Sequence, residues 1–261
     1  MVRLYTKSNP EIEEVRIKEK AEITQQTTSS HQADMEIHSS YIKSDAFQYP
    51  QAYIVIFSGG TTREKDYFKL LSNNALFPRF KFDFFPEPNF NTDDEPRIFE
   101  CAYQKVELYK SSATEEFPDS YYIISDVDHF YKHLVSNDEK CRQSGIKLII
   151  SNPCFEVWLY YSKYNDKFVG FTQPTDTLQL SKAIKKWYNK DGRIQTTKAI
   201  LDIEENIANA IMNYSENSDN LPDTYSTNMH IFASEILPYI KEEIAQIIEH
   251  NKKIREAYVN H

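Results

Sequence analysis

Two aspartates directly follow one of the most apolar stretches of the chain. Residues 121–125 have the composition of a buried strand, and Asp126 and Asp128 come after them. Because side chains two apart in a strand point to the same side, both carboxylates are expected at one place beyond the strand's carboxyl end, where open α/β sheets bind ligands. Two carboxylates repel each other unless a cation lies between them, and Mg²⁺ (or Mn²⁺) is the kind of hard cation that they hold. The alternative is an acidic turn without a ligand.

The elements around this pair alternate between strand and helix. Apolar or alternating aromatic runs predict four strands, at residues 52–57, 79–85, 119–125 and 146–150. Helical patterns follow each of them, at residues 63–71, 95–111, about 130–142 and 153–161. This order is typical of a mostly parallel sheet with helices on both faces, so the predicted fold class is α/β.

Three of the predicted strands end in residues that suit a binding site. These residues are Gly59 and Gly60, Asp126 and Asp128, and Ser151 and Asn152. Since the carboxyl ends of parallel strands meet at one edge of the sheet, we expect the three loops to converge on one crevice.

Composition limits the classes of function. The chain has 261 residues and a net charge of −9, so a broad, charge-driven nucleic-acid binder is excluded, and any bound nucleic acid must meet a local basic patch or a basic partner. Only five glycines are present and no glycine-rich phosphate loop occurs. Three widely spaced cysteines indicate reduced thiols, and the chain shows neither a signal peptide nor a membrane span, so we expect a cytoplasmic protein.

The chain is expected to divide into three regions. Residues 1–50 form a polar N-terminal extension that either grips a partner or second copy, or lies on its own domain. Residues 51–165 form the α/β core, and residues 166–261 form a helical region with helices at about 177–189, 196–214 and 229–258. The last helix carries isoleucines at helical spacing, so it either covers the core or docks a partner.

Four segments together resemble the RloB family, whose core is a Toprim-like fold. They are Gly60-Thr-Thr-Arg-Glu-Lys-Asp-Tyr-Phe68, Ile124-Ser-Asp-Val-Asp128, Ser151-Asn-Pro-Cys-Phe-Glu-Val-Trp-Leu159 and Ser226-Thr-Asn-Met-His230. The resemblance covers about residues 52–240 and implies a metal-dependent nuclease site. It also implies bacterial defence against phage beside an ABC-type ATPase that restrains the effector. The chain departs from the pattern at Gly59, where a glutamate is expected, and at Ser162, where the family tends to have a histidine.

Two glutamates are candidates to replace the missing one. Without a carboxylate at position 59, Glu64 in the first turn of the following helix is the nearest substitute and would join Asp126 and Asp128 as the third metal-binding carboxylate. Glu156 is the other candidate and would support the site or act as a base. From the residues alone, Glu156 is equally an acid at a helix N-terminus, and Asn152 an N-cap residue. His230 lies near the site by resemblance, although its type and position alone indicate a capping or core histidine.

One basic run could contact a nucleic-acid backbone. It consists of Lys182, Lys185, Lys186, Lys190 and Arg193, and the alternative is a solvated helix face. The sequence therefore predicts a Mg²⁺-dependent nuclease that cuts RNA, with tRNA included, or DNA. The competing hypothesis is a degenerate Toprim-like subunit that binds the ATPase partner or a nucleotide without cleaving. A homo-oligomer is compatible with both.

Overall fold

The computed structural model describes residues 52–60, 62–85, 95–112, 119–168 and 176–259. The chain divides into two compact units, Met1–Gln48 and Tyr49–His261. The predicted N-terminal extension lies outside the described residues, so only the second unit is discussed. No helix in its described part is long and apolar enough to cross a bilayer.

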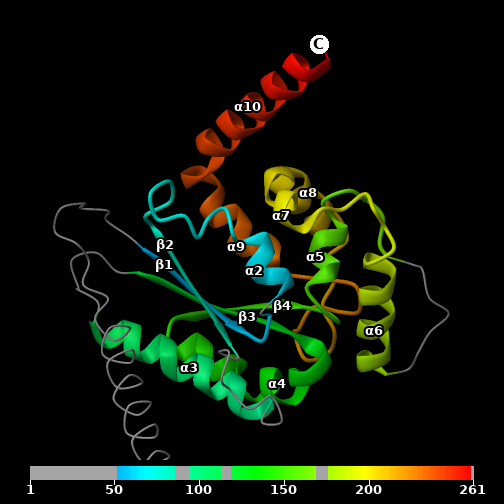
Figure 1. Cartoon of the computed structure of the whole chain (residues 1–261). Coiled ribbons are helices and arrows are strands. Elements are labelled where there is room, and N and C mark those ends of the chain that lie inside the picture. Colours follow the sequence, from blue (N-terminus) through cyan, green and yellow to red (C-terminus); the bar gives the residue numbers. More distant parts are fainter. Residues whose placement is uncertain (1–51, 61, 86–94, 113–118, 169–175, 260–261) are drawn as a thin grey trace, which may run out of the picture. The chain divides into compact units, whose positions relative to one another are not determined.

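A sheet of four parallel strands forms the centre of the described unit (Figure 1). The strands are β1 (Tyr53–Ser58), β2 (Phe80–Phe85), β3 (Ser120–Asp126) and β4 (Ile146–Ser151), in the order β2-β1-β3-β4. Val55 of β1 pairs with Phe82 of β2 and Tyr122 of β3, which fixes the register of the inner strands. All of β1 is buried, as expected for a strand that is covered on both faces.

Helices cover both faces of the sheet, which confirms the predicted α/β class. One face carries α3 (Glu95–Ser112) and α4 (Val127–Gln143), and the other carries α2 (Arg63–Tyr67), α5 (Glu156–Tyr160) and α9 (Met229–Ile236) (Figure 1). The second face has an aromatic core in which Phe57, Phe155, Trp158 and Phe232 are at most 1% exposed. The aromatic residues of the Ser151–Leu159 string therefore pack in the core, as their size favours.

The C-terminal region is helical, as predicted, but two of its helices are interrupted. The predicted helix at 196–214 is divided into α7 (Thr196–Ala199), the 3₁₀ turn η1 (Ile200–Asp202) and α8 (Ile203–Met212). The predicted helix at 229–258 breaks at the 3₁₀ turn η2 (Leu237–Tyr239) before α10 (Lys241–Val259). Pro238 lies in this turn, and a proline cannot donate the backbone hydrogen bond that a continuous helix needs.

The interruption divides the role of the C-terminal isoleucines. Ile236, Ile240 and Ile244 are at most 5% exposed and pack on the core, so this part covers the domain. Farther along α10, Ile254 is 41% exposed, and the helix extends away from the sheet (Figure 1). The remaining helix of the region, α6 (Thr177–Tyr188), lies beside α5 and α4 and brings its lysines to the sheet edge.

Candidate functional site

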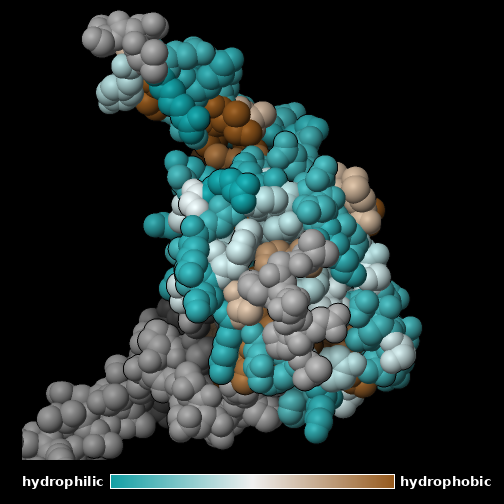
Figure 2. Space-filling view, turned by 90° about the vertical axis from the view of Figure 1, so that its right-hand side faces the viewer, coloured by the Kyte–Doolittle hydropathy of each residue, from teal (hydrophilic) through white to brown (hydrophobic). Residues whose placement is uncertain are grey.

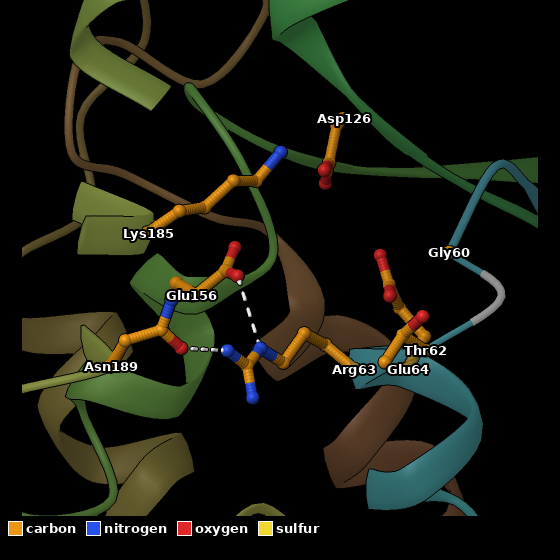
Figure 3. A pocket seen from close by; sticks show the side chains of 8 residues that line it. All are labelled: Gly60, Thr62, Arg63, Glu64, Asp126, Glu156, Lys185 and Asn189. Atoms are coloured by element: carbon orange, nitrogen blue, oxygen red, sulfur yellow. Dashed lines mark hydrogen bonds and ion pairs between the residues drawn. The ribbon is translucent and has the colours of Figure 1, made fainter. Parts of the chain in front are cut away.

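A pocket of about 370 Å³ lies at the carboxyl ends of β1 and β3 (Figure 3). Its lining comes from the β1–α2 loop, α2, the end of β3, α5 and α6, and consists of Gly60, Thr62, Arg63, Glu64, Asp126, Glu156, Lys185 and Asn189. The expected convergence of strand ends therefore occurs for the first and third strands.

Two carboxylates form the acidic wall of the pocket. Asp126 is the last residue of β3, and Glu64 lies in the first turn of α2. Their carboxylates face each other across the pocket (Figure 3). Glu64 is 7% exposed, although no lysine or arginine forms an ion pair with it among the described contacts. When both acids are ionised, the basic side chains of the pocket therefore neutralise their charge only in part.

Gly60 leaves the space that Glu64 occupies. Its φ is +75°, and a Cβ at this position would lie only 2.5 Å from Cδ of Glu64. The preceding Gly59 has a φ of +93°, a backbone conformation that residues other than glycine rarely adopt. The glutamate that the family resemblance places at position 59 would thus be strained in this backbone. In this chain the carboxylate beside Asp126 comes from Glu64.

The surroundings of Glu64 and Asp126 favour the protonated, neutral form of both acids unless a cation binds between them. Burial raises the pKa of Glu64 to about 7, and the charges of Glu156 and Asp128 add to the effect, while Lys185 opposes it. Burial also raises the pKa of Asp126 well above its usual value, with Glu64 and Asp128 contributing further. Ionisation of Glu64 or Asp126 costs free energy, because each carboxylate is removed from water and lies near other negative charges.

Asp128 has a different position from the one that strand alternation predicts. The helix α4 begins at Val127, earlier than the predicted residue 130, so Asp128 lies in the first helical turn and not on the strand. Ser181 donates a hydrogen bond of 2.5 Å to Oδ2 of Asp128, and Nζ of Lys185 lies 3.0 Å from the same oxygen. Asp128 therefore ties α4 to α6 and does not line the pocket.

Lys185 and Arg63 supply positive charge to the pocket. Burial lowers the pKa of Lys185, but Asp126 and Asp128 outweigh this effect, so the pKa lies above its usual value. The guanidinium of Arg63 lies 3.4 Å from Oε1 of Glu156, donates a hydrogen bond to Asn189 and stacks over the Tyr188 ring. Glu156 thus orients Arg63 from a nearly buried position, since its side chain is 3% exposed.

Several predicted site residues lie outside this pocket. Oγ of Ser151 is 2.9 Å from Oγ1 of Thr227, and the Asn152 amide donates to the carbonyl of Pro222, so both residues hold the 222–227 loop. Nδ1 of His230 lies 3.1 Å from the carbonyl of Thr227, and burial lowers the pKa of this histidine. These contacts match the capping and core readings of the residues.

The basic run is divided between the pocket and the surface. Lys185 lines the pocket, whereas Lys182, Lys186 and Lys190 are exposed along α6 and just after it. Arg193 pairs with Asp191 and lies over the Tyr164 ring. The sequence argument did not select Arg63 or Asn189 for the pocket. Only their positions in the sequence could have indicated them. Arg63 precedes the candidate Glu64, and Asn189 follows the candidate Lys185 by one helical turn.

The residues of the pocket fit a divalent cation by their chemistry. Mg²⁺ is commonly held by one or two carboxylates together with water and phosphate oxygens, and Glu64 and Asp126 provide two that face each other. Within the described ranges, no group of three or more His, Cys, Asp or Glu side chains is already arranged to hold a metal ion. A cation here would thus take its other ligands from water or a bound phosphate.

The fold and the pocket define an α/β protein whose parallel strands end at a crevice lined by both acidic and basic side chains. The model of the family described as RloB-like protein matches residues 54–236, and the chain belongs to this family. The match contains β1 from its second residue onward, the other three strands and every residue that lines the pocket. Neither a curated protein nor a solved structure gives a match.

Proposed function

We propose that this chain is a Mg²⁺- or Mn²⁺-dependent nuclease that cleaves phosphodiester bonds at the Glu64–Asp126 pocket. The observation that carries the proposal is the pair of facing carboxylates opposite Lys185 and Arg63. An acidic wall suits a divalent cation, and a basic wall suits the phosphate that the cation would share. The two walls together are complementary in charge to a phosphodiester, which is negative, and to a divalent metal ion bound beside it.

The acidic wall would hold the metal. Glu64 and Asp126 would be its protein ligands, and Asp128 would support them from the first turn of α4. When bound, a divalent metal supplies Lewis-acid stabilisation of the phosphate and lowers the pKa of a coordinated water. Gly60 leaves room for the Glu64 carboxylate, which a side chain at this position would displace.

The basic wall would bind the scissile phosphate. Arg63 is held by Glu156 and Asn189 and presents a planar guanidinium, which suits phosphate oxygens. Lys185 pairs with Asp128 and also lines the pocket, so its ammonium group would attract a phosphate bound there. Because Glu156 already pairs with Arg63, we assign it the supporting role and not that of the base.

The exposed lysines of α6 would extend the contact along the nucleic acid. Lys182 and Lys186 are one helical turn apart, so they share one side of α6, and Lys190 follows just after the end of this helix. This ridge provides the local basic patch that a chain of net charge −9 needs to bind RNA or DNA. We place the activity in bacterial anti-phage defence, in the cytoplasm, beside an ABC-type ATPase, on the basis of the family resemblance.

A second candidate is a non-catalytic subunit that binds the ATPase or a nucleotide. Gly59 stands where the resemblance expects a glutamate, and Lys185 already neutralises Asp128. In this alternative the pocket holds phosphate through Arg63 and Lys185 without a metal. The two candidates differ in whether the facing carboxylates are needed for function.

Matched carboxylate variants separate the two candidates. Asp126→Asn and Glu64→Gln should each abolish Mg²⁺- or Mn²⁺-dependent cleavage of tRNA, other RNA or DNA, and also phage protection. The control is Glu139→Gln, an exposed acid of α4 far along the helix from the pocket. Full phage protection in the Asp126 and Glu64 variants would contradict the nuclease proposal and support the binding subunit.

A further inference from the structure

The C-terminal helix α10 has an apolar stripe that the described part of the chain covers only at its start. Ile244 is 5% exposed, whereas Ile248, Ile254 and Tyr258 are 45%, 41% and 82% exposed. Figure 2 shows hydrophobic residues gathered where α10 joins the rest of the described unit. The exposed stripe continues from this buried base, so it extends an existing packing surface.

A second apolar feature lies beside the base of the helix. A groove of about 370 Å³ runs between α10 and the η1–α8 segment. Its apolar lining consists of Leu201, Ile203, Leu237, Ile244, Ala245 and Ile248. The groove is thus continuous with the stripe through the last three of these residues, and an apolar segment that packs on one would also reach the other.

The stripe forms a seam along one side of α10. Ile244, Ile248, Asn251, Ile254 and Tyr258 are separated by three or four residues, so they lie on the same side of the helix. Asn251 lies at the middle of this seam. A helix that only covered its own core would not need this pattern beyond Ile244.

Charge along α10 indicates which helix would pair with it. The first half, residues 241–250, carries three glutamates and one lysine, whereas residues 251–259 carry three basic residues and one glutamate. Two copies side by side in opposite directions would place the acidic half of each against the basic half of the other. The groove rim adds Asp202, Glu204 and Glu205, and two of these already pair with lysines of their own chain.

We propose that α10 forms an antiparallel pair with α10 of a second copy of this chain. With Asn251 opposite its own copy, Ile248 faces the partner's Ile254, and Tyr258 reaches the partner's groove beside the buried Ile244. Each exposed residue of the outer half thereby meets an apolar residue at the base of the other helix. The outer end of each helix then lies at the groove of the other subunit, and the interface is two-fold symmetric.

The oligomeric state of the full-length protein tests this proposal. Light scattering coupled to size-exclusion chromatography over a wide concentration series should show a dimer. Ile254→Asp and Tyr258→Asp place a charge in the seam, and each should raise the dimer dissociation constant by a factor of about 30 or more. Both side chains are exposed in the single chain, so these variants should fold normally. Gln246→Asp, on an exposed face away from the seam, should leave the dimer intact.

Disulfide cross-linking tests the direction of the helices. In a background with Cys101 replaced by serine, a mixture of Ile248→Cys and Ile254→Cys chains should form mainly the mixed disulfide. Cross-links only between identical positions would indicate parallel helices and would overturn the antiparallel alignment. A monomer at every concentration would overturn the proposal, as would a dimer that Ile254→Asp and Tyr258→Asp leave unchanged. The proposal would also be overturned if the stripe binds residues 1–48 of the same chain, or a different protein, in place of a second α10.

Discussion

Replacement of Glu64 by glutamine should stabilise the metal-free protein, and the gain should grow with pH. Burial and the neighbouring acids raise the pKa of Glu64 from 4.5 to about 7. An acid whose pKa is higher in the folded state than in the unfolded state binds protons more tightly when folded. Stability is therefore lost as the pH rises from about 4.5 through about 7, and the loss is complete above that range. Glutamine has nearly the same shape and carries no charge, so it removes this loss while keeping the contact with Gly60.

The magnitude follows from the size of the shift. A difference of one pKa unit corresponds to about 1.4 kcal/mol, so a shift from 4.5 to about 7 gives an upper limit of about 3 kcal/mol. We expect Glu64→Gln to exceed the wild type in unfolding free energy by up to this amount at pH 8.5. At pH 4, where Glu64 is protonated in both states, the two proteins should be nearly equal. Urea unfolding without divalent ions at a series of pH values measures the difference.

The same variant tests whether the pocket holds a cation. A ligand that binds only the folded state stabilises it in proportion to the logarithm of its concentration, so a tenfold excess of Mg²⁺ over its dissociation constant gives about 1.4 kcal/mol. Mg²⁺ should thus stabilise the wild type at pH 8.5 and have little effect on Glu64→Gln. The reasoning is refuted if the variant is less stable than the wild type at pH 8.5, or if the two proteins respond equally to Mg²⁺. Glu139→Gln serves as the control for surface charge.

Two further substitutions probe the elements that position the carboxylates. Lys185→Met should lower the unfolding free energy by about 1–3 kcal/mol, because it removes the ion pair between Lys185 and the buried carboxylate of Asp128. The lysine side chain is 40% exposed, so the effect falls below that of a fully buried pair. The same variant should gain more stability from Mg²⁺ than the wild type does, and an unchanged titration would contradict a role of Lys185 as the local counter-ion. Gly60→Ala should cost about 1–3 kcal/mol in urea unfolding, because φ at this position is +75°. It should also weaken the Mg²⁺ response, because its Cβ would lie 2.5 Å from Cδ of Glu64 and would displace that carboxylate. Gly145→Ala is the matched control, since Gly145 also has a positive φ but has no atom within 4 Å of the added Cβ, so equal effects of both substitutions on Mg²⁺ binding would argue against the close fit at Gly60.

Local sequence determined the sheet because each strand carries its own signal. The apolar runs that became β1, β3 and β4 are buried on both faces, so their composition alone distinguishes them from the helices around them. Asp126 was found because it closes an apolar strand, and parallel strands bring their carboxyl ends to one edge. Glu64 was found as the acid nearest to Gly59, in the first turn of the helix that follows the first strand. The family resemblance of the Ser151–Leu159 string depended on residue identity, although most of that string proved to be core.

Tertiary structure decided the features that depend on where an element ends or on what lies across from it. Asp128 turned toward Ser181 and Lys185 because α4 starts directly after Asp126, and no local pattern fixes a helix boundary to one residue. Arg63 and Asn189 entered the pocket only because α2 and α6, separated by more than a hundred residues, lie on either side of it. The negative charge of the chain could be read from its composition. The gathering of acidic and basic side chains in one pocket required the packing of α2, α5 and α6 around the end of β3.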